Sequence, residues 1–321
     1  MEQLNIAVMG CASIAQRMMI PAIKAVPGWN LLAVASRTQE KAEAFARQFG
    51  CEAVTGYKNL LNRKDIDAVY LPLPTGLHHE WIMKLLKAGK HVLAEKSIAY
   101  NYQSAKEMVV LARSKNLVLM EDYMFQYHSQ HDFVFELLDR KEIGDVRVFR
   151  AGFGFPPLPE GNFRYDDQTG GGALLDAAGY TVRAVHFVLG DNFRVKAANL
   201  HTDARTGTNT MGSAFLDNGK NISAQIAFGF DHFYQCNYEI WGSKGRIYVD
   251  RAFTPKPDYS PLIVVEKQGE RHEYHMKPDN HFMGALKEFH RAIMEEDEER
   301  HHHEVLLQSK TLEDIRKFSG Q

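Results

Sequence analysis

The chain has 321 residues, of which 45% are hydrophobic and 24% are charged, and its formal net charge at pH 7 is -2. This length suits about two domains with sizeable hydrophobic cores. A nearly balanced charge gives no basic field that nucleic acid or an anionic membrane would attract, so we expect small-molecule partners.

The beginning of the chain, MEQLNIAVMG, lacks the pattern of a signal peptide, and no apolar run approaches the roughly 18 residues of a membrane span. The three cysteines, Cys11, Cys51 and Cys236, are an odd number without a CxxC pair. This number fits a reducing compartment and argues against both a disulfide framework and a cysteine-rich zinc site. We therefore expect a cytoplasmic protein that holds no metal.

Residues 1–121 alternate short apolar segments with helical patterns of about 10 to 15 residues. LNIAVMG, for example, precedes SIAQRMMIPAIKAV, and HVLAEK precedes YQSAKEMVVLARSKN. Strands without polar alternation, separated by helices, are typical of a parallel sheet covered on both faces. The pattern predicts a doubly wound α/β domain of the Rossmann type over 1–121.

Residues 122–321 contain longer strand-like stretches such as DVRVFRAGFGF and ISAQIAFGFDHF, with turn pairs such as Asn218-Gly219. Helical patterns lie at FVFELLDRKEIG and ALLDAAGYTVRAVHFVLG, and another follows from HFMGALKEFHRAIM to the end. We expect an α+β substrate-binding domain on a mainly antiparallel open sheet. One face of that sheet needs a cover, which favours a homo-oligomer, dimer or tetramer.

A dinucleotide-binding turn is predicted at GCASIA, which directly follows the first strand and opens a helix. It fits the pattern G-x-A-x-x-A: Gly10 allows a tight turn, Ala12 lets a pyrophosphate approach the backbone, and Ala15 permits close helix packing. The second strand ends in Ser36-Arg37 rather than in an acidic residue. A guanidinium and a hydroxyl suit the 2′-phosphate, so the pair favours NADP(H) over NAD.

Three segments in this order, GCASIA, LPLPTGLHHEWIMKLLKAGKHVLAEKS and FRYDDQTGGGALLDAAGY, resemble the Gfo/Idh/MocA oxidoreductase family. The resemblance covers almost the whole chain. It implies that Lys96 matches the lysine of the family's E-K-P motif, which lies beside the nicotinamide and contacts the reacting oxygen. Ser97 replaces the usual proline. Glu95 and Lys96 also fall at the carboxyl end of a predicted parallel strand, where such sheets bind ligands.

The family commonly carries an Asp and a His four residues apart, and the matching positions here are Asp176 and Tyr180. A minority of relatives, among them glucose-fructose oxidoreductase-like enzymes and certain sugar 3-ketoreductases, also carry Tyr. An ordinary phenol is protonated at neutral pH, so Tyr180 is suited to donate to an oxygen that becomes alkoxide-like. This favours ketone reduction, with Lys96, Tyr180 and Asp176 as catalytic residues.

The strand ends and the resemblance together define the candidate cofactor-binding residues. They are Gly10, Cys11, Ala12, Ser13, Ile14, Ser36, Arg37, Leu71, Pro72, Leu73, His78, Glu95, Lys96 and Arg164. The resemblance places the Leu-Pro-Leu segment along the nicotinamide ribose and turns Arg164 toward the cofactor, and His78 matches the family's histidine after the turn, where a structural role stays open. The run His301 to His303 follows MEEDEER, and we expect it on a solvated surface rather than at a metal.

Three functions remain open from these residues. The leading one is an NADP(H)-dependent reductase of a keto group, C3 favoured, on a nucleotide-linked deoxysugar. The first alternative is a dehydrogenase that oxidises a free polyol, inositol or dihydrodiol. The second is a catalytically silent dinucleotide sensor, which the presence of Lys96, Asp176 and Tyr180 disfavours. The groove for a nucleotide stays unassigned, although Phe155, Arg164, Tyr165, His232 and Tyr234 fall in plausible loops.

Overall fold

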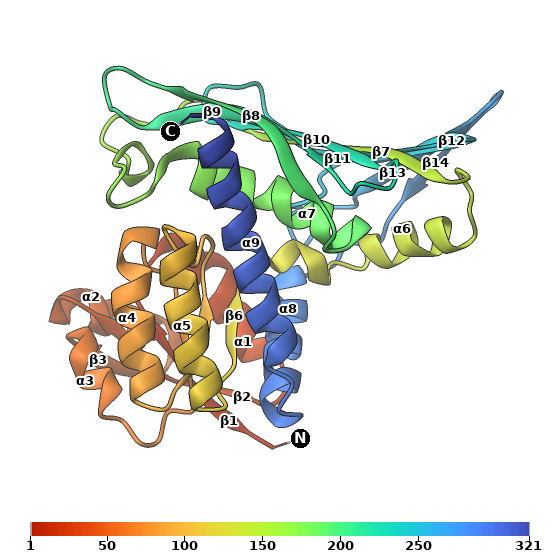
Figure 1. The fold of residues 1–321 in the computed structure, drawn as a ribbon. Helices are drawn as coiled ribbons and strands as arrows, with labels where there is room; N and C mark the ends of the chain where they lie inside the picture. Colours follow the sequence, from red (N-terminus) through yellow and green to blue (C-terminus); the bar gives the residue numbers. More distant parts are fainter. Residues whose placement is uncertain (1, 321) are drawn as a thin grey trace. The chain divides into compact units, whose positions relative to one another are not determined.

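The computed structural model describes residues 2–320. The chain forms two compact units. The first runs to Asp122 and includes Phe282–Ser309, and the second combines Tyr123–His281 with the segment that starts at Lys310. The first unit has the α/β architecture and the second the α+β architecture predicted from the sequence (Figure 1).

A parallel sheet of six strands, in the order β3-β2-β1-β4-β5-β6, forms the centre of the first unit. This order is that of the Rossmann fold, whose ligands bind at the carboxyl edge where β1 and β4 diverge. The strands are β1 (Leu4–Met9), β2 (Trp29–Ser36), β3 (Glu52–Thr55), β4 (Ala68–Leu71), β5 (His91–Ala94) and β6 (Leu119–Glu121).

Helices follow the strands of this sheet in alternation. They are η1 (Ala15–Met19, a π-helical turn), α1 (Ile20–Ala25), α2 (Gln39–Phe49), α3 (Tyr57–Leu61), α4 (Thr75–Lys87) and α5 (Tyr102–Ser114). The ends of two of them carry local signals. Asn101 caps α5, since its side chain accepts from the backbone N–H of Ser104 at 2.8 Å, and Gly50 ends α2 in a left-handed conformation with φ 69°.

Two features of the first unit differ from the sequence expectation. Strand β3 did not stand out in the sequence because it has four residues, of which Val54 alone is buried. The helical segment Phe282–Ser309, expected in the second domain, packs with the first unit instead. Trp29 Nε1 donates to the carbonyl of Leu286 at 3.0 Å, and Val305 lies in the core beneath the sheet.

The second unit contains an eight-stranded sheet in the order β14-β13-β12-β11-β7-β10-β9-β8. All neighbouring strands are antiparallel except β7 and β10, which are parallel. The strands are β7 (Val146–Gly154), β8 (Arg194–Thr202), β9 (Asn209–Asp217), β10 (Ser223–Gly229), β11 (Gln235–Gly242), β12 (Gly245–Val249), β13 (Leu262–Lys267) and β14 (Glu270–His275). The mainly antiparallel open sheet predicted for this part of the chain is confirmed.

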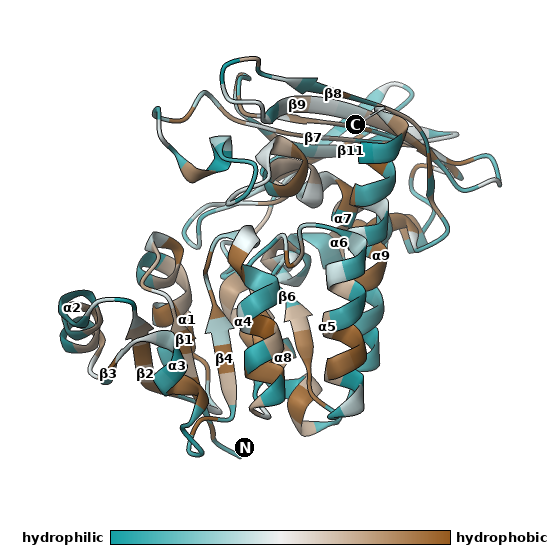
Figure 2. Ribbon diagram, turned by 60° about the vertical axis from the view of Figure 1, so that its left-hand side comes forward, coloured by the Kyte–Doolittle hydropathy of each residue, from teal (hydrophilic) through white to brown (hydrophobic). Residues whose placement is uncertain are grey.

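Helix α7 lies along one face of this sheet, against β7 and β10, while the opposite face carries no described helix (Figure 1). The helical elements are η2 (Met124–Tyr127), α6 (Gln130–Asp139), η3 (Phe163–Tyr165), η4 (Leu174–Ala178, a π-helical turn), α7 (Gly179–Leu189), α8 (His281–Met294) and α9 (Glu299–Phe318). Helices α8 and α9 belong largely to the first unit, and α9 enters the second unit at Lys310. In Figure 2 the helices around the six-stranded sheet carry both hydrophobic and hydrophilic stretches, as amphipathic helices do.

Candidate active site

The turn after β1 has the geometry that a dinucleotide requires. Gly10 has a φ of +124°, and a Cβ at this position would lie 2.8 Å from Cδ2 of Leu73. The turn and the loop after β4 therefore touch, which brings the predicted cofactor residues Gly10 and Leu73 together. Ser13 is exposed, Ala12 and Ile14 are half-buried, and burial raises the pKa of the Cys11 thiol. A side chain larger than hydrogen at residue 10 would close this approach.

Ser36 and Arg37 stand at the carboxyl end of β2, the neighbour of β1. Ser36 is 5% exposed and its Oγ accepts from the N–H of Thr38 at 3.4 Å, while Arg37 is exposed. Burial raises the pKa of Tyr57, and the charge of Arg37 offsets part of that rise. A cation thus stands where the ribose of a dinucleotide meets the second strand of this fold. The two side chains fit a 2′-phosphate.

His78 joins the two loops that carry the remaining first-unit candidates. It is fully buried at the start of α4, and its Nε2 lies 2.7 Å from the carbonyl oxygen of Leu73 and its Nδ1 2.9 Å from that of Ser97. Burial lowers the pKa of His78 to about 4, against the two carbonyl groups that favour the charged form. This side chain fixes the loop after β4 to the loop after β5. Leu71 and Pro72, which precede Leu73, are buried as well.

Lys96 lies in a short segment, Glu95–Ile98, that follows β5 and is held at several points. The hydroxyl of Tyr70 donates to Glu95 Oε1 at 2.7 Å, and the backbone N–H of Ile98 donates to Glu121 Oε1 at 2.8 Å. The peptide between Lys96 and Ser97 is cis. Lys96 itself is half-buried. The chain thus fixes the backbone on both sides of this lysine.

A carboxyl that the sequence did not single out lies beside this segment. Asp122 follows β6, is fully buried, and neither of its carboxylate oxygens has a hydrogen-bond partner among residues 2–320. Burial, together with the charges of Glu95 and Glu121, raises the pKa of Asp122 well above its ordinary value.

In the second unit, Asp176 and Tyr180 fall one turn apart where η4 passes into α7. The carboxylate of Asp176 forms an ion pair with Arg164, with Nε 2.8 Å from Oδ2. The ring of Tyr180 is 5% exposed and packs against the rings of Phe153, Tyr123 and Phe253 at centroid distances of 4.7, 5.5 and 5.9 Å. These ring contacts fix the orientation of the Tyr180 side chain. Arg164, Asp176 and Tyr180 are thus brought to the same helix start.

The start of that helix is built by glycines of the third sequence motif and by two residues, Asn209 and Arg183, that the sequence did not reveal. Gly171 and Gly172 both have positive φ, and a Cβ on Gly172 would lie 2.5 Å from the carbonyl oxygen of Asn209. The side chain of Asn209 on β9 accepts from the N–H of Leu174 at 2.7 Å. Arg183, one turn after Tyr180, is 3% exposed with its guanidinium 5.4 Å from the Tyr123 ring centroid. Arg183 could have been found from the sequence, because it is an arginine in a helical segment that is mainly apolar.

The expectation for the histidine run was wrong for two of its members. His301 and His302 are 1% and 0% exposed. Nε2 of His302 lies 3.0 Å from the carbonyl of Leu117, and Nε2 of His301 lies 3.1 Å from Glu288 Oε1. They are buried because α9 turns this face toward the rest of the first unit. No group of three or more His, Cys, Asp or Glu in the described chain is arranged to hold a metal ion.

Comparison with known proteins extends these observations over the whole chain. Residues 4–123 match the GFO_IDH_MocA description "Oxidoreductase family, NAD-binding Rossmann fold", and residues 132–248 match the GFO/IDH/MocA C-terminal domain. The chain belongs to the Gfo/Idh/MocA oxidoreductase family. The recognition made from the three sequence motifs is confirmed, and so is the expectation of an oxidoreductase.

Several members of the Gfo/Idh/MocA family that are highly similar to this chain are reductases of one dTDP-linked sugar. The chain is 47% identical over 293 residues to a dTDP-3,4-didehydro-2,6-dideoxy-alpha-D-glucose 3-reductase of Saccharopolyspora spinosa, covering 91% of this chain and 88% of that one. The corresponding reductase of Actinomadura kijaniata is 39% identical over 311 residues, 97% and 94% of the two chains. A crystal structure of a 3-ketoreductase from Actinomadura kijaniata with NADP and TDP-benzene has a TM-score of 0.95 at 38% identity, covering 98% of both chains.

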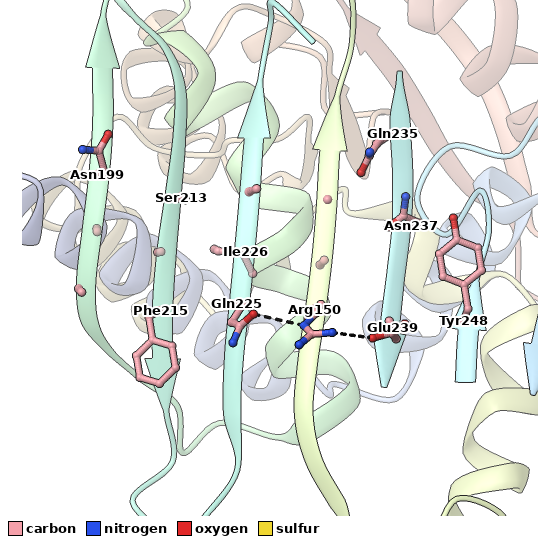
Figure 3. Close-up of a pocket in the computed structure, with 16 residues that line it drawn as sticks. Arg150, Asn199, Ser213, Phe215, Gln225, Ile226, Gln235, Asn237, Glu239 and Tyr248 are labelled. Carbon is pink, nitrogen blue, oxygen red and sulfur yellow. Dashed lines mark hydrogen bonds and ion pairs between the residues drawn. The ribbon is translucent and has the colours of Figure 1, made fainter. Parts of the chain in front are cut away.

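Two further observations concern the molecule as a whole. Each helix within residues 2–320 is too short or too polar to cross a bilayer. A groove of about 750 Å³ crosses the uncovered face of the eight-stranded sheet (Figure 3). Arg150 lies in its middle and contacts Gln225 at 3.3 Å and Glu239 at 3.1 Å. The groove is on the face away from α7, so it is separate from Asp176 and Tyr180.

Proposed function

We propose that this protein is an NADPH-dependent ketoreductase that reduces the C3 keto group of a nucleotide-linked deoxysugar. The observation that carries the proposal is the near full-length similarity, up to 47% identity, to reductases of a dTDP-linked dideoxysugar. The tyrosine at residue 180 agrees with it, because a protonated phenol is suited to reduction. The chain carries all three side chains that the proposed reduction uses, those of Lys96, Asp176 and Tyr180.

The residues that would hold the cofactor fit NADP(H). The open turn at Gly10, the guanidinium of Arg37 and the hydroxyl of Ser36 suit a pyrophosphate and a 2′-phosphate. The remaining proposed contacts come from Cys11 to Ile14, from the loop Leu71–Leu73 and from Glu95. When bound, the reduced nicotinamide supplies the hydride. Replacement of Arg37 by an uncharged residue would then weaken the binding of NADPH more than the binding of NADH.

In the proposed mechanism Lys96 donates a hydrogen bond to the keto oxygen, and Tyr180 gives that oxygen its proton as the carbon is reduced. Donors that are already in place when charge develops contribute about 3 to 4 kcal/mol each. Asp176, held by Arg164, orients the sugar through its hydroxyl groups. The phenolate that remains on Tyr180 regains its proton from water. No metal enters this scheme, since the lysine polarises the carbonyl.

One further comparison supports Lys96 and Tyr180 as the pair that acts. Crystal structures of the Actinomadura kijaniata 3-ketoreductase include a variant with a tyrosine changed to phenylalanine and variants with a lysine changed to alanine or glutamate. The two substituted residues are separated along that chain by the same number of residues as Lys96 and Tyr180 in this one. The matching spacing makes these two side chains the first to test.

The test follows NADPH absorbance with a panel of dTDP-linked and UDP-linked keto-sugars, and NADP⁺ reduction with free polyols. We expect consumption of NADPH with a dTDP-linked 3-keto-deoxysugar. Lys96→Met removes the charged donor and should lower kcat by about two to three orders of magnitude. Silence on every keto-sugar together with polyol oxidation would establish the dehydrogenase alternative. Turnover by Lys96→Met at the rate of the unchanged protein would remove Lys96 from the mechanism.

We also propose that two copies associate through the uncovered face of the eight-stranded sheet. Trp241 and Phe215 are 49% and 39% exposed there, although both are large apolar side chains. Arg150, Glu239 and Arg246 form ion pairs across the strands of this face. Such a surface of exposed aromatics with charges already paired suits a self-complementary contact. The cytoplasm remains the predicted compartment, and the three free cysteines support it.

A further inference from the structure

A second cavity, of about 450 Å³, lies in the second unit between the loop after β7 and the turn that joins β8 to β9. We call it the loop pocket. Leu158, Tyr165 and Phe230 form its apolar wall, and Glu160, Asp203 and Arg205 stand among its polar groups. Its volume falls within the range of small-molecule sites. The sequence pointed to Tyr165 as a loop residue plausible for a nucleotide, but it could not reveal the cavity, because the lining residues come from separate parts of the chain.

The loop pocket is preformed by hydrogen bonds that fix its walls. The phenol oxygen of Tyr165 accepts from the N–H of Leu158 at 2.9 Å, which closes the loop on itself. The hydroxyl of Thr208 donates to the carbonyl of Tyr165 at 2.9 Å, and the N–H of Asp203 donates to the carbonyl of Thr208 at 3.0 Å. These bonds tie the loop to the β8–β9 turn. A ligand would therefore find the cavity already shaped, which lowers the entropic cost of binding.

Charge in the loop pocket identifies which part of a nucleotide it accepts. Three carboxylates, those of Glu160, Asp203 and Asp231, accompany one guanidinium, that of Arg205. Arg205 is already engaged, since its Nη2 donates to Asp203 Oδ2 at 2.8 Å and its hydrogen bonds lower the pKa of Asp203 to about 2. An excess of negative charge repels a diphosphate. An uncharged, planar group is favoured instead.

The position of the loop pocket relative to Tyr180 follows from a continuous run of aromatic rings within the second unit. Tyr180 lies 4.7 Å from Phe153, Phe153 lies 5.9 Å from Phe155, and Phe155 stacks on Phe230 at 5.1 Å. Phe230 then meets Tyr165 at 5.9 Å in the pocket wall. The neighbouring residue Arg164 pairs with Asp176. Three ring-to-ring steps of 4.7, 5.9 and 5.1 Å therefore separate the proposed catalytic tyrosine from the pocket wall at most. The ribose, the diphosphate and the sugar of the substrate would extend over this separation.

We propose that the loop pocket binds the base of the nucleotide-linked substrate, and that this base is a pyrimidine with an imide edge, such as thymine. The inference rests on the proposed function and assigns a place to a part of its substrate. An imide presents one N–H between two carbonyl oxygens. The carboxylates accept from the N–H, and the guanidinium of Arg205 and the hydroxyl of Thr210 donate to the carbonyl groups. Adenine places a ring nitrogen acceptor where thymine has its N–H, so the carboxylates disfavour it.

The test measures binding of thymidine diphosphate and of adenosine diphosphate to the protein saturated with NADP⁺, by calorimetric titration. We expect the unchanged protein to bind thymidine diphosphate at least about tenfold more tightly than adenosine diphosphate. Thr206→Trp projects an indole from an exposed position of the pocket rim. It should raise the Kd for thymidine diphosphate by about tenfold or more and raise KM for the keto-sugar with little change in kcat.

Thr206→Ala is the matched control, because both variants lose the 3.3 Å hydrogen bond that the Thr206 hydroxyl accepts from Thr208 and the alanine leaves the cavity open. It should bind thymidine diphosphate as the unchanged protein does. An equal Kd for both nucleotides, no binding of thymidine diphosphate, or its undiminished binding to Thr206→Trp would each overturn the base pocket. The NADPH assay judges the proposed function separately, since a reductase that holds its base elsewhere still consumes NADPH.

Discussion

The hydroxyl of Tyr180 belongs to a ring that is otherwise enclosed by other aromatic rings. Tyr180→Phe should therefore leave the packing and the free energy of unfolding nearly unchanged while it removes the proposed proton donor. We expect kcat for the keto-sugar to fall by about two to three orders of magnitude, with a smaller change in KM. Steady-state NADPH consumption and urea denaturation of the same variant measure both quantities.

Tyr238→Phe is a matched control in the same unit, because the hydroxyl of Tyr238 lies 2.9 Å from Nδ1 of the buried His131. This variant should lose about 1 kcal/mol of stability and keep its kcat. The two substitutions thus separate a catalytic hydroxyl from a structural one. A Tyr180→Phe enzyme with undiminished kcat would mean that the proton comes from another group, and the preference for reduction inferred from residue 180 would lose its basis.

The segment Glu95–Ile98 has no regular secondary structure, so its conformation depends on side chains of neighbouring strands. Glu121 at the end of β6 accepts the buried N–H of Ile98, and an unpaired buried N–H costs about 1 to 3 kcal/mol. Glu121→Leu should lower stability by that amount and lower kcat by about tenfold, because Lys96 is no longer held in place. Glu121→Gln keeps a carbonyl acceptor and should restore most of kcat.

The comparison of the two Glu121 variants distinguishes positioning from charge. If the carboxylate acted through its charge, Gln would be as inactive as Leu; if it acts by holding the backbone, only Leu is impaired. Dissociation of NADPH, measured by fluorescence, serves as the second quantity, since a general loss of fold would weaken it as well. Equal kcat values for all three proteins would show that this hydrogen bond does not position Lys96.

Across the whole chain, the features that could be predicted from the sequence are those that leave a periodic pattern or a short motif. The alternation of apolar strands and helices was enough for a doubly wound parallel sheet, and GCASIA and HVLAEK placed Gly10 and Lys96 at its carboxyl edge. Contacts between distant segments gave no such pattern. The burial of His302 against Leu117, the cap that Asn209 provides and the loop pocket each join segments that nothing local relates. The burial of Asp122 could not be predicted either, because an aspartate in a sequence is ordinarily expected at the surface.

Buried neutral histidines give the molecule a predictable sensitivity to acid. Burial lowers the pKa values of His78 and His186 to about 4 and those of His131 and His281 to about 3. In the unfolded chain the same imidazoles take up protons near pH 6.5. Between pH 6.5 and 4 the unfolded state therefore binds more protons than the native state. The free energy of unfolding must fall as pH falls through this window, by about 1.4 kcal/mol per pH unit for each fully titrating histidine.

Asp122 acts in the opposite direction, because its raised pKa keeps a proton on the native state that the unfolded state has lost. Its contribution to stability decreases as pH rises, and so does that of His301, whose pKa is raised, despite burial, by hydrogen bonds to Glu288 and Glu304. These are two groups against four. Carboxylates with lowered pKa values, such as Glu288, act only below about pH 4.5. Urea midpoints at pH 7, 6 and 5 should therefore decrease steadily, and His186→Gln should reduce the slope by about one histidine's share. Midpoints that stay constant over this range would contradict the burial of these four imidazoles in their neutral form.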